Sequence, residues 1–260
     1  MLVLLSPAKN LDFEPASLTV APTQPRLEKD TAQLVTRAKR LSRSDLRGLM
    51  KISESLADLN YERFQKLAEG LSEDEAKPAA LAFNGDVYRG LDASTLSDES
   101  LNWAQKHLRI LSGLYGVLRP LDQIHPYRLE MGSKLSTRRG EDLYDFWGDR
   151  ISKLLNEDLT DAAGPVLNLA SKEYFSAVDK KALKADIVEV VFREEKDGMS
   201  KIISFYAKYA RGLMARWIID NRIERLEDVK AFDVDGYAFN AELSSDKSLV
   251  FCRPQPDPKS

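Results

Sequence analysis

Short apolar blocks alternate with polar segments along this chain, and the period of each block predicts whether it forms a strand or a helix. Apolar blocks too short for a helix predict strands at 2–5, 79–83, 108–111, 166–169, 187–192, 201–205, 237–239 and 248–252. Lys196-Asp197-Gly198 separates the fifth block from the sixth, and an Asp-Gly pair is typical of a tight hairpin. The polar turn at 244–247 indicates a second hairpin between the last two strands.

Apolar residues at spacings of three and four predict helices at 29–68, 97–106, 141–159 and 206–221. Ser72 and Glu75 have the spacing of a capping box and predict a short helix that ends at Pro78. Three prolines between residues 12 and 27 indicate an extended surface loop.

The predicted elements mix hairpins with helical crossovers, and they show neither regular strand-helix alternation nor an internal repeat. This order predicts an α+β fold with a mixed sheet. No linker divides the sequence, so we expect a single domain over residues 1–260. The helical subregion at 29–77 would form a lobe over the sheet and create a cleft.

Charge and composition restrict the classes of function. The 38 basic and 41 acidic residues give a net charge of −3, which excludes a uniformly basic nucleic-acid-binding surface and requires any anion site to be local. One cysteine excludes an intrachain disulfide. We find neither a secretory signal nor a membrane span, and we expect a cytoplasmic protein. The two histidines lack the spacing of metal ligands, and the sequence contains neither a P-loop nor a dinucleotide fingerprint. We therefore expect neither a metal nor a cofactor.

A cationic stripe is expected within the helical subregion. Arg43, Arg47 and Lys51 are four residues apart and would share one helix face, which Arg40 would join if the helix continued backward past Ser42. Residues 56–60 then occupy the place of a turn between two helices, where a helix-hairpin-helix element binds phosphates through backbone N–H groups. Such a turn usually contains Gly, whereas here Asn60 tolerates left-handed geometry and Asp58 adds a negative charge. A solvated basic face fits the same pattern.

A second basic set lies in the last predicted helix, where Lys208, Arg211 and Arg216 are interleaved with aromatic residues. Cations among aromatic rings suit unpaired bases, although burial of the rings in the core is an alternative. Ser6 and Lys9 have the spacing of a Ser-Lys nucleophile pair, but the partner motifs of that enzyme class are absent. Lys9 is better interpreted as a phosphate contact or as an amine that attacks a sugar carbonyl in damaged DNA.

Further candidates lie at predicted strand ends and glycine turns. Arg89, Arg119 and Arg128 accompany the turns at 84–86 and 113–116 and favour an anion site. Asn168, Ser171, Lys172 and Tyr174 flank a strand end that opens a helix. Glu130 and Asp145 are the acidic residues expected nearby, either in proton transfer or as salt-bridge partners of Arg128 and Lys9.

Several of these segments together resemble one family. They are Ser6-Pro7-Ala8-Lys9 and the stretches 81–91, 111–122, 126–132, 142–149, 168–175 and 203–218. The set is similar to the YaaA family of bacterial peroxide stress resistance proteins, from Met1 to about Phe251. The resemblance implies a cytosolic protein that supports survival of hydrogen peroxide and limits intracellular iron. It also implies an unusual α+β fold with a positively charged cleft, a helix-hairpin-helix element and DNA binding.

The sequence therefore supports two main hypotheses. The first is sequence-independent binding of duplex or locally opened DNA, through Lys9, Arg40, Arg43, Arg47, Lys51, Asn60, Arg89, Arg119, Arg128, Lys172, Lys208 and Arg211. The second is an enzyme that acts on a damaged base or an anionic small molecule, with Lys9, Glu130 and Asp145 as the catalytic residues. A protein interaction module is a third possibility, without a residue signature.

Overall fold

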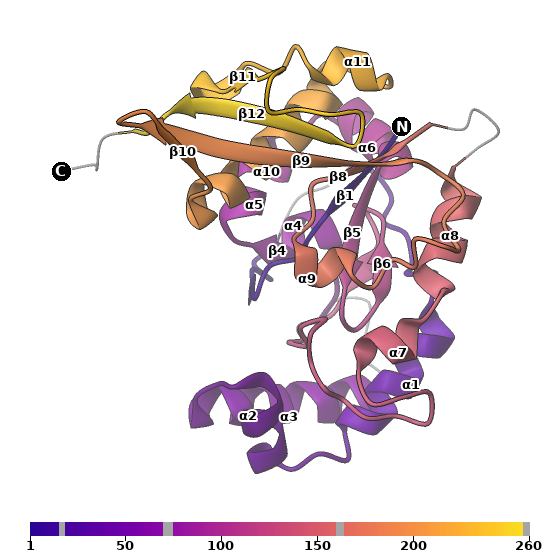
Figure 1. Cartoon of the computed structure of the whole chain (residues 1–260). Coiled ribbons are helices and arrows are strands. Elements are labelled where there is room, and N and C mark those ends of the chain that lie inside the picture. Colours follow the sequence, from indigo (N-terminus) through magenta and orange to yellow (C-terminus); the bar gives the residue numbers. More distant parts are fainter. Residues whose placement is uncertain (16–18, 70–74, 160–163, 257–260) are drawn as a thin grey trace.

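A computed structural model describes residues 1–15, 19–69, 75–159 and 164–256, and its centre is a mixed sheet (Figure 1). The strand order in the main sheet is β11-β12-β9-β8-β1-β5-β6, and β10 pairs with one end of β9. The bounds are β1 Leu2–Leu5, β5 Leu108–Ser112, β6 Gly116–Leu118, β8 Val166–Asn168, β9 Ile187–Lys196, β10 Met199–Lys201, β11 Ala238–Phe239 and β12 Ser248–Pro254. Two small pairs join β2 Asn10–Leu11 to β4 Phe83–Asn84 and β3 Lys77–Pro78 to β7 Gln123–Ile124.

The five central strands are parallel, and the outer strands β6, β10 and β11 are antiparallel to their neighbours. β1 lies between β5 and β8, and all four of its side chains are buried, which explains why Leu2–Leu5 lacks polar alternation. The expected α+β fold with a mixed sheet is confirmed. Because parallel strands end at the same edge, the segments that follow β1, β5 and β8 emerge side by side.

The described residues also form eleven helices. Their bounds are α1 Glu28–Ala38, α2 Arg43–Met50, α3 Glu54–Glu69, α4 Ala79–Ala82, α5 Asp86–Leu91, α6 Asp98–His107, α7 Leu143–Trp147, α8 Arg150–Asp158, α9 Lys172–Phe175, α10 Ser204–Asp220 and α11 Leu226–Val229. The longest, α10, contacts β9 and α6 and packs closely on α5. Gly90 of α5 and Gly212 of α10 form the closest part of this contact, where the backbones leave no room for a Cβ atom. None of the described helices is both long and apolar enough to cross a membrane.

Most element predictions are confirmed, and the exceptions have local causes. Residues 79–82 form a helical turn instead of a strand, because Pro78 starts the turn and three alanines favour it. The predicted helix at 141–159 is two helices, since Gly148 has a φ of 50° and ends the first. The hairpin at 196–198 is confirmed, with positive φ at both Asp197 and Gly198. The strand predicted at 201–205 is wrong beyond its first residue, because β10 ends at Lys201 and α10 begins at Ser204. The capping box at 72–75 falls largely outside the described residues.

α1, α2 and α3 form a helical lobe, residues 28–69, which projects from the lower end of the molecule in Figure 1. Ser42 and Asp45 make a capping box, so α2 starts at Arg43 and the cationic stripe does not continue back to Arg40. α2 ends at Met50, and the capping residue Lys51 that follows has a φ of 51°. The turn between α2 and α3 is therefore at 51–53. The expected turn at 56–60 is wrong because these residues lie inside α3.

Candidate functional site

The segments that follow β1, β5 and β8 meet at the carboxyl edge of the sheet. We call this place the carboxyl-edge site and define it by Ser6, Lys9, Tyr88, Ser112, Tyr127, Arg128, Glu130, Ser171, Lys172 and Tyr174. In Figure 1 β1 runs from the N label toward the lower half of the molecule, so this edge faces the side on which the helical lobe projects. Residues from five of the family-like segments are thus brought together by the strand order.

Ser6 joins the segments after β1 and β8. Its Oγ donates to Ser171 Oγ at 3.2 Å and accepts the Ser171 backbone N–H at 2.8 Å. The Ser6 carbonyl accepts the hydroxyl of Tyr88 at 3.0 Å, which adds α5 to the site. Because these bonds engage Ser6 with Ser171, and no hydrogen bond joins it to Lys9 within the described chain, the site lacks a Ser-Lys nucleophile pair.

Lys9, Glu130 and Arg128 form an ion-pair chain. Lys9 Nζ lies 2.8 Å from Glu130 Oε2, and Arg128 Nη2 lies 3.0 Å from Glu130 Oε1. The Lys9 side chain is 61% exposed, whereas those of Glu130 and Arg128 are mostly buried. Arg128 Nε is buried without a hydrogen-bond partner. This geometry matches the interpretation of Glu130 as the salt-bridge partner of both cations, and it leaves the Lys9 amine accessible.

Three tyrosines line the inner side of the site. Burial is the main cause that raises the pKa of Tyr88, Tyr127 and Tyr174 above the usual value, and neighbouring tyrosines or carboxylates add to it. The Tyr127 hydroxyl lies 2.6 Å from Ser112 Oγ. Hydroxyls with raised pKa values stay protonated near neutral pH, so they are neutral hydrogen-bonding groups and not bases. Sequence analysis did not single out Tyr88 or Tyr127, although both lie in family-like segments.

α10 presents Lys208 and Arg211 one turn apart. The next residue, Gly212, meets Val87 of α5, which directly precedes Tyr88. Arg211 is largely buried, and burial lowers the pKa of its guanidinium. Its Nε is buried without a hydrogen-bond partner, and in the described part of the chain its side chain makes no ion pair.

Arg211 differs in this respect from the deeply buried arginines elsewhere. Arg109 pairs with Asp158 at 2.7 Å, and Arg253 pairs with Asp235 and lies 3.6 Å from Glu194. A buried charge is normally paired because desolvation is costly. Among the described residues, no carboxylate pairs with Arg211, although its guanidinium is partly removed from solvent.

The remaining predicted site residues are distributed over the molecule. Arg43 pairs with Asp58 and Glu62 and stacks on Tyr61, so its charge is balanced within the helical lobe. Exposed cations without an ion pair in the described residues are Arg40, Arg47, Lys51, Lys172 and Lys208.

Four further predicted residues have local structural contacts. Asn60 is fully buried, and its Nδ2 donates to the Leu56 carbonyl at 2.8 Å, so it is not at a surface turn as expected. Asp145 accepts the backbone N–H of Glu141 and pairs with neither Lys9 nor Arg128. Arg119 is held by buried Asp122, and Arg89 pairs with Asp86 on the surface of α5.

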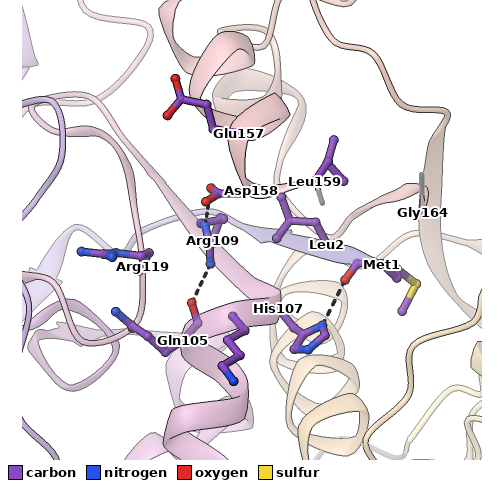
Figure 2. Close-up of a pocket in the computed structure, with 11 residues that line it drawn as sticks. Met1, Leu2, Gln105, His107, Arg109, Arg119, Glu157, Asp158, Leu159 and Gly164 are labelled. Carbon is purple, nitrogen blue, oxygen red and sulfur yellow. Dashed lines mark hydrogen bonds and ion pairs between the residues drawn. The ribbon is translucent and has the colours of Figure 1, made fainter. Parts of the chain in front are cut away.

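The opposite, amino-terminal edge of the sheet holds a cavity of about 450 Å³ (Figure 2). Arg109 donates to Asp158 and to the Gln105 carbonyl, and Arg26 forms two hydrogen bonds of 2.7 Å with the same Asp158. His107 stacks on Trp103 and contacts the Met1 carbonyl at 3.4 Å. Internal partners satisfy most of these polar groups, so we interpret this arrangement as structural support for β1, β5 and α8.

No group of three or more His, Cys, Asp or Glu residues in the described ranges is arranged to hold a metal ion. The groups available at the carboxyl-edge site are cations, neutral hydroxyls and one ion-paired carboxylate. These groups can bind an anion and donate hydrogen bonds to it.

Fold and site together define an α+β protein with a candidate anion-binding site where parallel strands end. The family model of the peroxide stress protein YaaA matches residues 1–243, and the chain belongs to this family. It is 54% identical to a UPF0246 protein of Idiomarina loihiensis over 98% of this chain and 99% of the relative. It is 56% identical to a UPF0246 protein of Maricaulis maris over 98% of this chain and 97% of the relative.

Proposed function

We propose that this chain binds DNA without sequence preference, through phosphate contacts at the carboxyl-edge site, at Lys208 and Arg211, and on the helical lobe. The observation that carries the proposal is Arg211, a largely buried guanidinium without an acidic partner in the described chain. Removing one partner of a buried ion pair typically costs about 3–5 kcal/mol. A bound phosphate would supply the missing charge, and the guanidinium fork matches phosphate oxygens.

The distribution of unpaired cations supports a polymeric anion. Lys172 and Lys208 are exposed near the carboxyl edge, and Arg47 and Lys51 are exposed on the helical lobe, toward which this edge faces (Figure 1). A single phosphate cannot reach both regions, whereas a DNA strand offers phosphates along its length. Non-specific binding of this type has a Kd of roughly 10⁻⁴–10⁻⁶ M at physiological salt and weakens steeply as salt is added.

In a family of peroxide stress proteins, binding of this kind would protect DNA from iron-driven damage in the cytoplasm. Phosphate contacts displace the cations condensed on DNA, and this includes iron(II) held by the phosphates. We expect the protein to reduce plasmid nicking by iron(II) and hydrogen peroxide, and Arg211→Met to lose this protection. Equal protection by the variant would contradict the proposal.

The direct test is fluorescence anisotropy of labelled duplex, bubble and single-stranded DNA as a function of salt. Arg211→Met keeps the size of the side chain, and Arg47→Glu reverses an exposed charge on the lobe. Each should weaken binding to every sequence, and Arg211→Met should reduce the salt slope by about 1. Arg225→Glu is the matched control, since Arg225 is 75% exposed next to α11, outside the proposed surface. Unchanged binding by both variants would refute the proposal.

A second candidate is an enzyme that acts on damaged DNA or an anionic small molecule. The observation in its favour is the accessible Lys9 amine, 2.8 Å from a carboxylate that can accept a proton. Such an amine can attack a sugar carbonyl and form an imine with loss of water. We expect borohydride to trap this imine on DNA that contains an abasic site, and Lys9→Ala to abolish trapping while DNA affinity remains. Absence of trapping with the natural protein would exclude this chemistry.

A further inference from the structure

An arginine-lined cavity of about 480 Å³ lies between α1 and the turn that precedes α7. It is separate from the carboxyl-edge site and shares no residue with it. Its lining residues are Ala32, Gln33, Thr36, Arg37, Arg40, Thr137, Arg138, Arg139 and Phe146. We call it the arginine cavity.

Among the residues that the structure describes, four arginines and no acidic residue line the arginine cavity. Arg37 Nε donates to the Ser136 carbonyl at 2.8 Å, which fixes the guanidinium and leaves its other nitrogens available. Arg139 lies over the Phe146 ring at 4.5 Å and pairs with Asp30 through Nη1. Arg40 and Arg138 are exposed and make no ion pair in the described chain.

Among the described residues, ion pairs balance the charge of one of the four arginines that line the arginine cavity. Asp30 is the acidic side chain that the structure pairs with one of the four arginines, and it also lies 3.4 Å from Arg150. Two of the four guanidiniums are held in place by the backbone or by an aromatic ring, so part of the entropy cost of binding has already been met. Four arginines around one cavity, two of them held in place, favour an anion with several oxygens.

Geometry and size together restrict the ligand. Guanidinium groups bind phosphate oxygens in pairs, and a terminal phosphate with two negative charges benefits most from several arginines. A cavity of about 480 Å³ is within the range of small-molecule sites and exceeds the needs of one phosphate. We propose that the arginine cavity binds a phosphomonoester of mononucleotide size. This chemistry occurs in free mononucleotides and in the 5′-phosphorylated end of a DNA strand.

The test uses titration calorimetry with AMP and with adenosine, on the natural protein and on the double variant Arg40→Gln, Arg138→Gln. Both side chains are exposed and unpaired, so the variant should keep the melting temperature. We expect AMP to bind at least tenfold more tightly than adenosine and the double variant to lose at least tenfold in AMP affinity. The matched control is Arg225→Gln, Lys230→Gln, which removes the same charge at α11, at the opposite end of the molecule in Figure 1.

Two further experiments identify the source of the phosphate and distinguish this site from the proposed DNA-binding surface. The first compares a labelled oligonucleotide with and without a 5′-phosphate. Tighter binding of the phosphorylated form, together with its displacement by AMP, would assign the site to strand ends. AMP binding without that preference would assign it to free mononucleotides. Arg211→Met should leave AMP affinity unchanged, even if it abolishes DNA binding. Equal affinity for AMP and adenosine, or full AMP affinity in the double variant, would overturn the proposal.

Discussion

Replacement of Gly212 by alanine should destabilise the contact between α5 and α10. A Cβ atom at Gly212 would lie 1.8 Å from the Val87 carbonyl oxygen and 2.8 Å from the Leu91 nitrogen. These are backbone atoms of a helix, so no side-chain rotation can relieve the overlap. The two helices must separate, and Lys208 and Arg211 must move relative to Tyr88.

The magnitude follows from two opposing terms. Overpacking of this type costs about 1–3 kcal/mol, or more where backbone must move. Alanine gains back about 1 kcal/mol from its higher helix propensity. Because the overlap involves backbone, we expect a net loss of about 2 kcal/mol. For a chain of this size such a loss lowers Tm by about 4–8 °C.

Gly48→Ala is the matched control, since Gly48 is also inside a helix but a Cβ there would meet nothing within 4 Å. It should raise Tm by about 2–4 °C through helix propensity alone. The assay is thermal unfolding followed by circular dichroism, with DNA anisotropy on both variants. A Gly212→Ala variant as stable as the natural protein would refute the argument, because the helices would then not be in contact at this point.

Two further predictions concern the amino-terminal edge of the sheet. Asp158→Asn should cost about 3–5 kcal/mol by leaving Arg26 and Arg109 without a carboxylate. Burial alone would raise the pKa of Asp158, but hydrogen bonds from both arginines outweigh it and lower the pKa below 3.8. The difference in Tm between the natural protein and Asp158→Asn should therefore be constant from about pH 5 to 8 and become smaller below about pH 4. Burial lowers the pKa of His107 below 6.5, so the neutral ring should give its full contribution to the free energy of unfolding above that pH, and this contribution should decrease at lower pH. In thermal scans, the Tm of His107→Gln should lack this decrease.

The sequence predicted the strands and the longer helices well, because burial on both faces produces continuous apolar runs such as Leu2–Leu5. It did not predict that β1 lies between the parallel strands β8 and β5. Local patterns contain no information on strand order, which depends on pairing between distant residues. The same limit applies to α4, where Pro78 and a run of alanines outweighed the strand-like apolar pattern.

The candidate site was predictable in composition but not in arrangement. Lys9, Glu130 and Arg128 were candidates, and their ion pairs agree with one of the expected roles. By contrast, the placement of Asn60 failed because α3 continues through the expected turn. Whether Arg43 is neutralised by Asp58 and Glu62 depends on how α2 packs on α3, which helical spacing cannot show.

The central position of β1 has a consequence for synthesis of the protein. Leu2 pairs with Val166, so after its synthesis β1 must wait for about 164 further residues before one of its two neighbours is available. At about 5–20 residues per second, this delay is roughly 8 to 33 seconds. Throughout this period four consecutive apolar residues have an unpaired strand edge, which promotes association between nascent chains. Chaperone binding to the β1 segment of the nascent chain would therefore contribute to the yield of folded protein.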